Sequence, residues 1–139
     1  MKLLGIVGHE AAKFTPEQIP LVKFEIEMAI VGDNPEAVCS GECHLGGVDI
    51  WAREVAEKMG VPFIPYPPAT RNWTGYRARN LQIAAADKVI CVVVKALPAG
   101  YKGMRFSGCY HCGARNPPHV KSGGCWTAWK CREREWRII

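Results

Sequence analysis

The chain has 139 residues, of which 48% are hydrophobic and 22% are charged. This composition is typical of one folded domain with a core, and it excludes a disordered chain. No apolar run reaches the roughly 18 residues that a membrane span needs, and the first apolar stretch is too short for a secretory signal, so we expect a cytoplasmic protein.

Positive charge is concentrated in the C-terminal third. Residues 100–139 hold 8 Lys and Arg against 2 Asp and Glu, whereas residues 1–99 hold 10 against 11. A basic segment of this kind is typical of a protein that binds phosphate groups, either in a nucleotide or in a nucleic acid strand. An ordinary solvated basic face is the alternative.

Apolar runs and turn residues predict strands that alternate with helices. Buried strands are expected at 2–8, 36–40, 61–66 and 88–94, with a short strand or tail at 136–139, and helices are expected from Thr15 to Ile30, at 48–59, at 75–86 and at 125–135. The first helix should begin with a capping box, because Thr15 is followed by Pro16 and Gln18. The run KVICVVV at 88–94 indicates a strand that is buried on both faces.

This alternation predicts an α/β fold with a mostly parallel sheet and helices on both of its faces. We expect a Rossmann-like three-layer sandwich in which residues 1–139 form a single nucleotide-binding domain. The segment 95–124 has no periodicity and holds glycines, prolines and a CxxC motif, so we expect it to be a Cys-rich metal-binding insertion within that domain.

Loops at the carboxyl ends of the strands should line one crevice, where sheets of this kind bind ligands. One of them, SGECHLGGVD at 40–49, is longer than the two to six residues that a strand-to-helix turn needs. Gly46 and Gly47 precede the helix, where backbone N–H groups bind phosphate well. Asp49 is suited to hold the loop or to accept a hydrogen bond from a ribose hydroxyl. A glycine-rich turn without a ligand is the alternative.

Two further segments suit the same ligand. Trp73, Tyr76, Arg77, Arg79 and Asn80 offer stacking faces for a base and a guanidinium fork for phosphate or carboxylate. These aromatic residues could instead cover the sheet edge, with Arg77 in solvent. Ser122-Gly123-Gly124 opens the last helix, with Thr127 in its first turn, and forms a second candidate anion site.

Three segments carry a family resemblance. SGECHLGGVDIWAREVAEKMGVP (40–62) is similar to SGGAxGVDxxAxxxAxxxGIP, YRARNLQIAAADKVICVV (76–93) to RNRxIAxxADxVIAV, and SGGCWTAWKCRE (122–133) to GGTxxTxxxAxxxG. These patterns belong to the SLOG superfamily, the Rossmann-like group that contains DprA/Smf and the LOG phosphoribohydrolases. The opening GIVGHE resembles the family's turn after the first strand, with Glu10 where Arg is usual. The resemblance covers most of the chain outside 95–121.

The resemblance implies nucleotide contacts from Gly8, Ser40, Gly41, Gly47, Asp49, Arg79, Asn80, Gly123, Gly124 and Thr127. The hydrolytic LOG branch has PGGxGTxxE with a catalytic Glu, whereas this chain has SGGCWTAW (122–129) and no Glu at the matching place. We therefore expect a bound nucleotide, with cleavage of an N-glycosidic bond dependent on another group such as Glu10, Asp49 or His44. SLOG relatives are often dimers, which implies a homodimer.

The seven cysteines favour a metal site over disulfides, because their number is odd and the expected compartment is reducing. Cys109 and Cys112, followed by Gly113, form a CxxCG knuckle. With His119 and Cys125 they make our preferred ligand set for a closed, structural Zn²⁺ site. Cys131 is the weaker fourth candidate, since it lies far around the predicted helix from Cys125. Buried thiols or an iron–sulfur cluster are the alternatives, and His111 should point away from the metal.

Two functions follow from these features. The first is the binding of a nucleotide or nucleotide derivative, with or without N-glycosidic cleavage. The second is DprA-like binding of single-stranded nucleic acid by the basic, zinc-braced C-terminal third, with Trp126, Trp129 and Trp136 stacking on bases. The spacings of these tryptophans are also typical of a buried helix face. Tight binding of a mononucleotide would favour the first function, and steeply salt-dependent DNA binding the second.

Overall fold

The computed structural model describes residues 1–112 and 118–139, and it has an α/β fold. The five strands are parallel and lie in the order β3-β2-β1-β4-β5. They are β1 (Leu3–Gly8), β2 (Ala37–Ser40), β3 (Phe63–Pro65), β4 (Lys88–Val93) and β5 (Arg134–Ile138). The α-helices of the described residues are α1 (Ile19–Asp33), α2 (Val48–Lys58), α3 (Trp73–Ala84) and α4 (Gly123–Lys130). The predicted α/β class and parallel sheet are confirmed.

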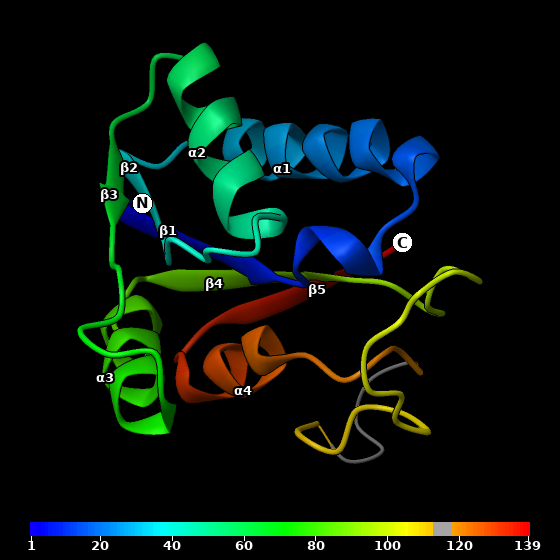
Figure 1. The fold of residues 1–139 in the computed structure, drawn as a ribbon. Helices are drawn as coiled ribbons and strands as arrows, with labels where there is room; N and C mark the ends of the chain where they lie inside the picture. The colour runs from blue at the N-terminus through cyan, green and yellow to red at the C-terminus, as the bar shows by residue number, and fades with distance from the viewer. Residues whose placement is uncertain (113–117) are drawn as a thin grey trace.

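Helices cover both faces of the sheet, with α1 and α2 on one side and α3 and α4 on the other (Figure 1). β4 shows why. Ile90 and Val92 pack into the core beneath α1 and α2, whereas Val89, Cys91 and Val93 pack into the core on the side of α3 and α4. A central strand buried on both faces has no polar side, which explains the continuous apolar run.

The first helix begins with the predicted capping residues. The backbone N–H of Thr15 donates a hydrogen bond of 2.9 Å to Oε1 of Gln18, and residues 16–18 form a short 3-10 turn before the α-helix proper. The helix ends where Asn34 adopts a left-handed conformation, with φ of 47°, just before Pro35.

The prediction of a helix over 125–135 is wrong at its C-terminal end. The helix stops at Lys130, and Cys131 is extended with φ of −85° and ψ of 147°. Residues 134–138 instead pair with β4, with Arg134 opposite Val89 and Ile138 opposite Val93. The backbone hydrogen bonds of this fifth strand override a helix-like side-chain pattern, because local propensity is weaker than sheet pairing in place.

The carboxyl ends of the parallel strands lie at one edge of the sheet. The segment after β4, in yellow, and the start of α4 lie on this side of the molecule (Figure 1). Neither residues 1–112 nor 118–139 contain a helix long and apolar enough to cross a membrane.

Candidate functional site

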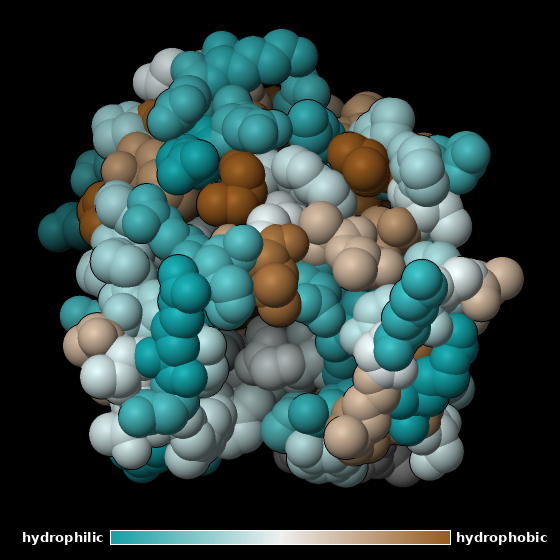
Figure 2. Space-filling model, in the orientation of Figure 1, coloured by the Kyte–Doolittle hydropathy of each residue, from teal (hydrophilic) through white to brown (hydrophobic). Residues whose placement is uncertain are grey.

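A cavity of about 720 Å³ lies at the carboxyl ends of the strands. Figure 2 shows the molecule hollowed below the centre of the face viewed, between α3 and the segment that follows β4. The cavity is lined by Val7, Gly8, His9, Glu10, Lys13, Glu42, Cys43, His44, Leu45, Asp49, Pro67, Pro68, Arg71, Trp73, Tyr76, Arg79, Asn80, Ile83, Lys121, Ser122, Gly123, Gly124 and Thr127. Its volume is in the range of small-molecule and cofactor sites.

A buried ion pair lies in one wall of the cavity. Asp49, in the first turn of α2, is only 9% exposed, and its Oδ2 lies 4.0 Å from Nη1 of Arg79 on α3. Gly41 makes room for this pair, because a Cβ there would collide with the Arg79 guanidinium. The distance of 4.0 Å is too long for a hydrogen bond. Nη1 of Arg79 is buried and has no hydrogen-bond acceptor within the described residues.

The pKa of Asp49 lies close to neutral pH. Burial raises the pKa of Asp49 to about 6, and Arg79 and Ser40 offset part of this rise. The Ser40 hydroxyl oxygen lies 2.9 Å from Oδ1 of Asp49 and 2.5 Å from the carbonyl oxygen of Ile6. The hydroxyl has one proton, which it shares between the carbonyl oxygen of Ile6 and the Asp49 carboxylate, and donation to the carboxylate is what lowers the pKa of Asp49.

The charges that line the cavity are unequally paired. Each of its three acids has a cation nearby, since Glu10 lies 3.6 Å from Lys13, Glu42 lies 3.5 Å from Arg53 and Asp49 lies beside Arg79. Lys121 and Arg71 line the same cavity and form no ion pair with any residue in 1–112 or 118–139. The cavity therefore has a surplus of positive charge.

Aromatic side chains form a further part of the wall. Trp73, at the start of α3, is 56% exposed and packs edge-on against Trp126 with ring centroids 5.1 Å apart. The guanidinium of Arg79 lies 5.6 Å from the ring centre of Tyr76. Trp129 of α4 and Trp136 of β5 do not line the cavity. Their ring centroids are 5.0 Å apart, and both rings pack against the core on the side of the sheet that α3 and α4 cover. For these two tryptophans the core interpretation fits better than base stacking.

The predicted site residues fall into two groups. Gly8, Asp49, Arg79, Asn80, Gly123, Gly124 and Thr127 line the cavity, as do the candidate catalytic residues Glu10, Asp49 and His44. Ser40, Gly41 and Gly47 lie outside the lining. Ser40 is hydrogen-bonded to Asp49, and Gly41 leaves room for the Arg79 guanidinium. Gly47 packs against the backbone of residues 9–11, and Arg77 is exposed on α3 away from the cavity.

His9 is a cavity residue to which sequence reasoning assigned no role. It is 3% exposed, its Nε2 donates a hydrogen bond of 2.9 Å to the carbonyl oxygen of Lys121, and its Nδ1 accepts one of 3.2 Å from the N–H of Val94. It thus ties the end of β1 to the end of β4 and to the segment before α4. Burial lowers the pKa of His9 to about 4, so the ring is neutral at pH 7.

We expect His9 to make stability depend on pH. Below its unfolded pKa of 6.5, the unfolded chain binds a proton that the folded chain binds only near pH 4, so the free energy of unfolding falls as the pH drops through this window. The full loss is about 3 kcal/mol at roughly 1.4 kcal/mol per pKa unit. Urea unfolding of the wild type and of His9→Gln at pH 7, 5.5 and 4 measures it.

The comparison between the wild type and His9→Gln isolates the contribution of His9 to the pH dependence of stability. Asp49 contributes with the opposite sign, because its raised pKa adds stability as the pH falls through about 6, but it titrates in both proteins. The stability advantage of the wild type over His9→Gln should therefore shrink towards pH 4. An advantage that stays constant with pH would contradict the buried, neutral state of His9.

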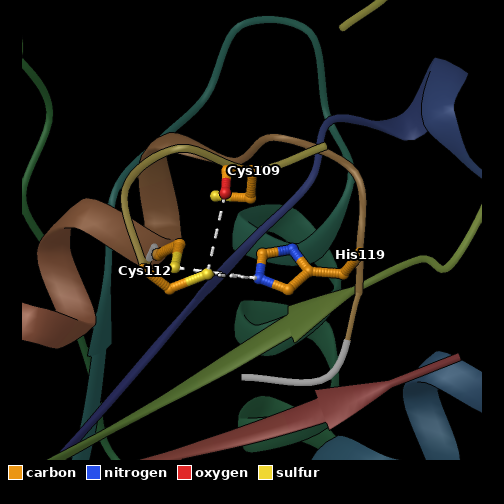
Figure 3. A group of neighbouring side chains, drawn as sticks. Cys109, Cys112 and His119 are labelled. Atoms are coloured by element: carbon orange, nitrogen blue, oxygen red, sulfur yellow. Dashed lines mark hydrogen bonds between the residues drawn. The ribbon is translucent and has the colours of Figure 1, made fainter. Parts of the chain in front are cut away.

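Four side chains beside the cavity form a candidate metal site, which we call the Cys/His cluster (Cys109, Cys112, His119 and Cys125). Their sulfur and nitrogen atoms all lie within 4.8 Å of one another. Figure 3 shows the sulfur of Cys112 between Cys109 and the His119 ring, whose Nε2 is 3.4 Å away. These are the four predicted ligands, and the candidate site is confirmed.

The orientation of His119 and the protonation of Cys125 bear on how the cluster would bind a cation. Nδ1 of His119 lies 2.8 Å from the carbonyl oxygen of Val120 and donates to it, which leaves the lone pair of Nε2 facing the sulfurs. Burial raises the pKa of Cys125 above its ordinary value, so a metal must displace the thiol proton when it binds.

The other candidate ligands lie apart from the cluster. The thiol of Cys131 donates to the carbonyl oxygen of Ala86 at 3.4 Å, which removes it as the fourth ligand. The ring of His111 packs against Tyr110, with centroids 4.4 Å apart. Gly113, the predicted turn residue of the knuckle, lies outside the described residues.

Comparisons of the chain with protein-family models, with curated proteins and with solved structures gave no match. The SLOG resemblance of the motifs therefore stays a prediction, and the function must be argued from the site itself.

Proposed function

We propose that the cavity binds a nucleotide or nucleotide derivative through its phosphoribosyl group. The observation that carries this proposal is Arg79. A buried guanidinium nitrogen without an acceptor costs free energy, and buried polar groups nearly always have partners. Because the Arg79 side chain lines the cavity, an anionic group of a ligand that binds beside it would supply the guanidinium with the acceptor it lacks.

The rest of the cavity fits the same ligand class. Its surplus charge comes from Lys121 and Arg71, and its wall includes the N-terminal turn of α4, where backbone N–H groups favour an anion. Trp73 and Tyr76 offer aromatic faces to a base. The strand order and the helices on both faces support a Rossmann-like three-layer sandwich, which binds nucleotides at this edge of the sheet. The SLOG-like motifs point the same way.

Hydrolysis of an N-glycosidic bond would need a group that activates water. Asp49 lines the cavity, and its pKa of about 6 is close to the range in which a carboxylate works well as a general base. Glu10 is the second carboxylate, although Lys13 and the hydroxyl of Tyr101, 3.4 Å away, already contact it. His44 lies on the exposed rim. We therefore propose binding as the function and treat cleavage as the reaction to be measured.

We propose that the Cys/His cluster binds Zn²⁺ in a structural role. Three thiols and one imidazole match the preference of zinc, and four protein ligands leave no coordination position for water or substrate. An iron–sulfur cluster with four cysteines fits less well, because the fourth donor is His119 rather than Cys131.

Replacement of Arg79 by Ala should weaken nucleotide binding. The loss of a charged hydrogen bond costs about 1.5–3 kcal/mol, or about 10- to 100-fold in Kd. Calorimetry with a panel of nucleoside mono- and diphosphates measures this loss, and chromatography of each mixture detects a released base. Arg77→Ala is the matched control, because Arg77 is an exposed arginine of the same helix outside the cavity, and it should bind as the wild type does.

Equal binding by Arg79→Ala and the wild type would reject the proposed site. If no nucleotide binds and single-stranded DNA binds with steep salt dependence instead, the DprA-like alternative is the better function. The basic character of residues 100–139 is the observation that keeps this alternative under test.

A further inference from the structure

One wall of the cavity lies between two members of the Cys/His cluster. His119 and Cys125 flank five residues, and four of these, Lys121 to Gly124, line the cavity. The backbone of His119 is also fixed, because its carbonyl oxygen accepts a hydrogen bond of 3.1 Å from the N–H of Cys109. Any cation that joins the four donors would therefore fix both ends of this wall.

Lys121 is held by side chains of the same Cys-rich segment. Its ammonium group lies 4.6 Å from the ring centre of Phe106 and 5.3 Å from that of Tyr110, distances at which cation–π attraction operates. Tyr110 lies between Cys109 and Cys112 in sequence, so the cluster positions this ring directly. The carbonyl oxygen of Lys121 accepts the hydrogen bond of His9. The ammonium and the backbone of Lys121 are thus both held, although no acid among residues 1–112 and 118–139 pairs with it.

We propose that Lys121 determines the specificity of the cavity for an anionic group of the ligand, and that a metal ion in the Cys/His cluster positions Lys121 for this contact. The inference rests on the proposed function and adds the residue that recognises the charge. Without metal, the rings of Phe106 and Tyr110 are joined to Lys121 by the cation–π contacts, and the segment of Cys109 is joined to His119 by one backbone hydrogen bond. With metal bound, the aromatic rings and the lysine form one rigid unit.

The test compares two probes that differ only in a phosphate, AMP and adenosine, on the zinc-loaded protein. The wild type should bind AMP more tightly than adenosine. Lys121→Gln should reduce this ratio on the order of 10-fold, while it binds adenosine and one equivalent of zinc as the wild type does. Lys130→Gln is the matched control, since Lys130 also lies over an aromatic ring, that of Trp126 at 5.2 Å, but does not line the cavity. Its ratio should not change.

Two further proteins test the role of the metal. Zinc-stripped wild type should lose the preference for AMP as Lys121→Gln does, and hydrogen exchange of the amides in 120–127 should speed up. Since the stripped chain could also unfold, the double variant Phe106→Leu/Tyr110→Leu provides an independent test. Both rings are exposed, at 42% and 62%, so the variant should fold, keep its zinc and still lose part of the AMP preference.

The outcomes separate the two proposals. Equal binding of AMP and adenosine by the wild type, or an unchanged ratio in Lys121→Gln, overturns the role of Lys121 and leaves the nucleotide site intact. An unchanged ratio and unchanged exchange in folded, zinc-stripped protein overturn the positioning role of the metal. If neither probe nor any other nucleotide binds, the proposed function fails, and the Lys121 contact fails with it.

Discussion

Removal of zinc by a chelator is expected to lower the melting temperature by about 10 °C or more. Structural zinc contributes its binding free energy directly to folding, and a loss of 1 kcal/mol shifts the melting temperature of a domain of this size by roughly 2–4 °C. The cluster joins the segment after β4 to α4, and much of that segment is exposed and lies outside the main core. Calorimetry before and after treatment with EDTA, and again after zinc is restored, measures the effect.

Two matched cysteine variants tell which thiols bind the metal. Cys125 and Cys131 are both buried and lie near the two ends of α4, so Ser substitution disturbs packing similarly in each. Cys125→Ser should lose most of the bound zinc, whereas Cys131→Ser should keep one equivalent per chain by elemental analysis. The reverse result would make Cys131 the fourth ligand. Visible absorbance of the purified protein would instead indicate an iron–sulfur cluster.

Gly47→Ala is expected to destabilise the fold by about 3 kcal/mol or more. Gly47 has φ of 89°, a region that L-residues adopt only with strain, and a Cβ there would collide with the backbone of His9 and Ala11. Gly123→Ala is the control, because Gly123 also lies at the start of a helix, as the first residue of α4, but has open space where the Cβ would lie, so it should cost less than about 1 kcal/mol. Urea unfolding of both variants at pH 7 measures the difference.

The result for Gly47 bears on the meaning of the glycine-rich loop. The N–H of Val48 donates a hydrogen bond of 3.1 Å to the carbonyl oxygen of His9, so Gly47 lets the start of α2 pack directly on the loop after β1. This contact places Asp49 beside Arg79. A stability loss as small as that of Gly123→Ala would show that the close approach is not required. In that case the glycine would need another explanation, such as direct contact with a ligand.

The sequence alone was sufficient where the signal is local or repeats along the chain. The run KVICVV gave β4 because only a strand buried on both faces has no polar side. Alternating strands and helices predicted a parallel sheet, since parallel strands need helical crossovers. The CxxC spacing with His119 and Cys125 nearby predicted the preferred cluster, because two thiols two residues apart can bind one metal ion, but the sequence left Cys131 open as the fourth ligand and only the structure excluded it from the cluster.

The tertiary structure decided what depends on contacts between distant segments. The sequence predicted a short strand or tail at 136–139 but assigned residues 134 and 135 to a helix, because the stability of β5 comes from backbone pairing with β4, some 45 residues earlier. Gly41 and Gly47 could not be told from ligand-binding glycines, because the atoms that demand them belong to Arg79 and to the loop after β1. The surplus charge of the cavity likewise emerged only from the fold, in which Glu10, Glu42 and Asp49 have cations nearby, whereas Lys121 forms no ion pair with any described residue. A sequence gives the charges, but only the fold determines which of them neutralise one another.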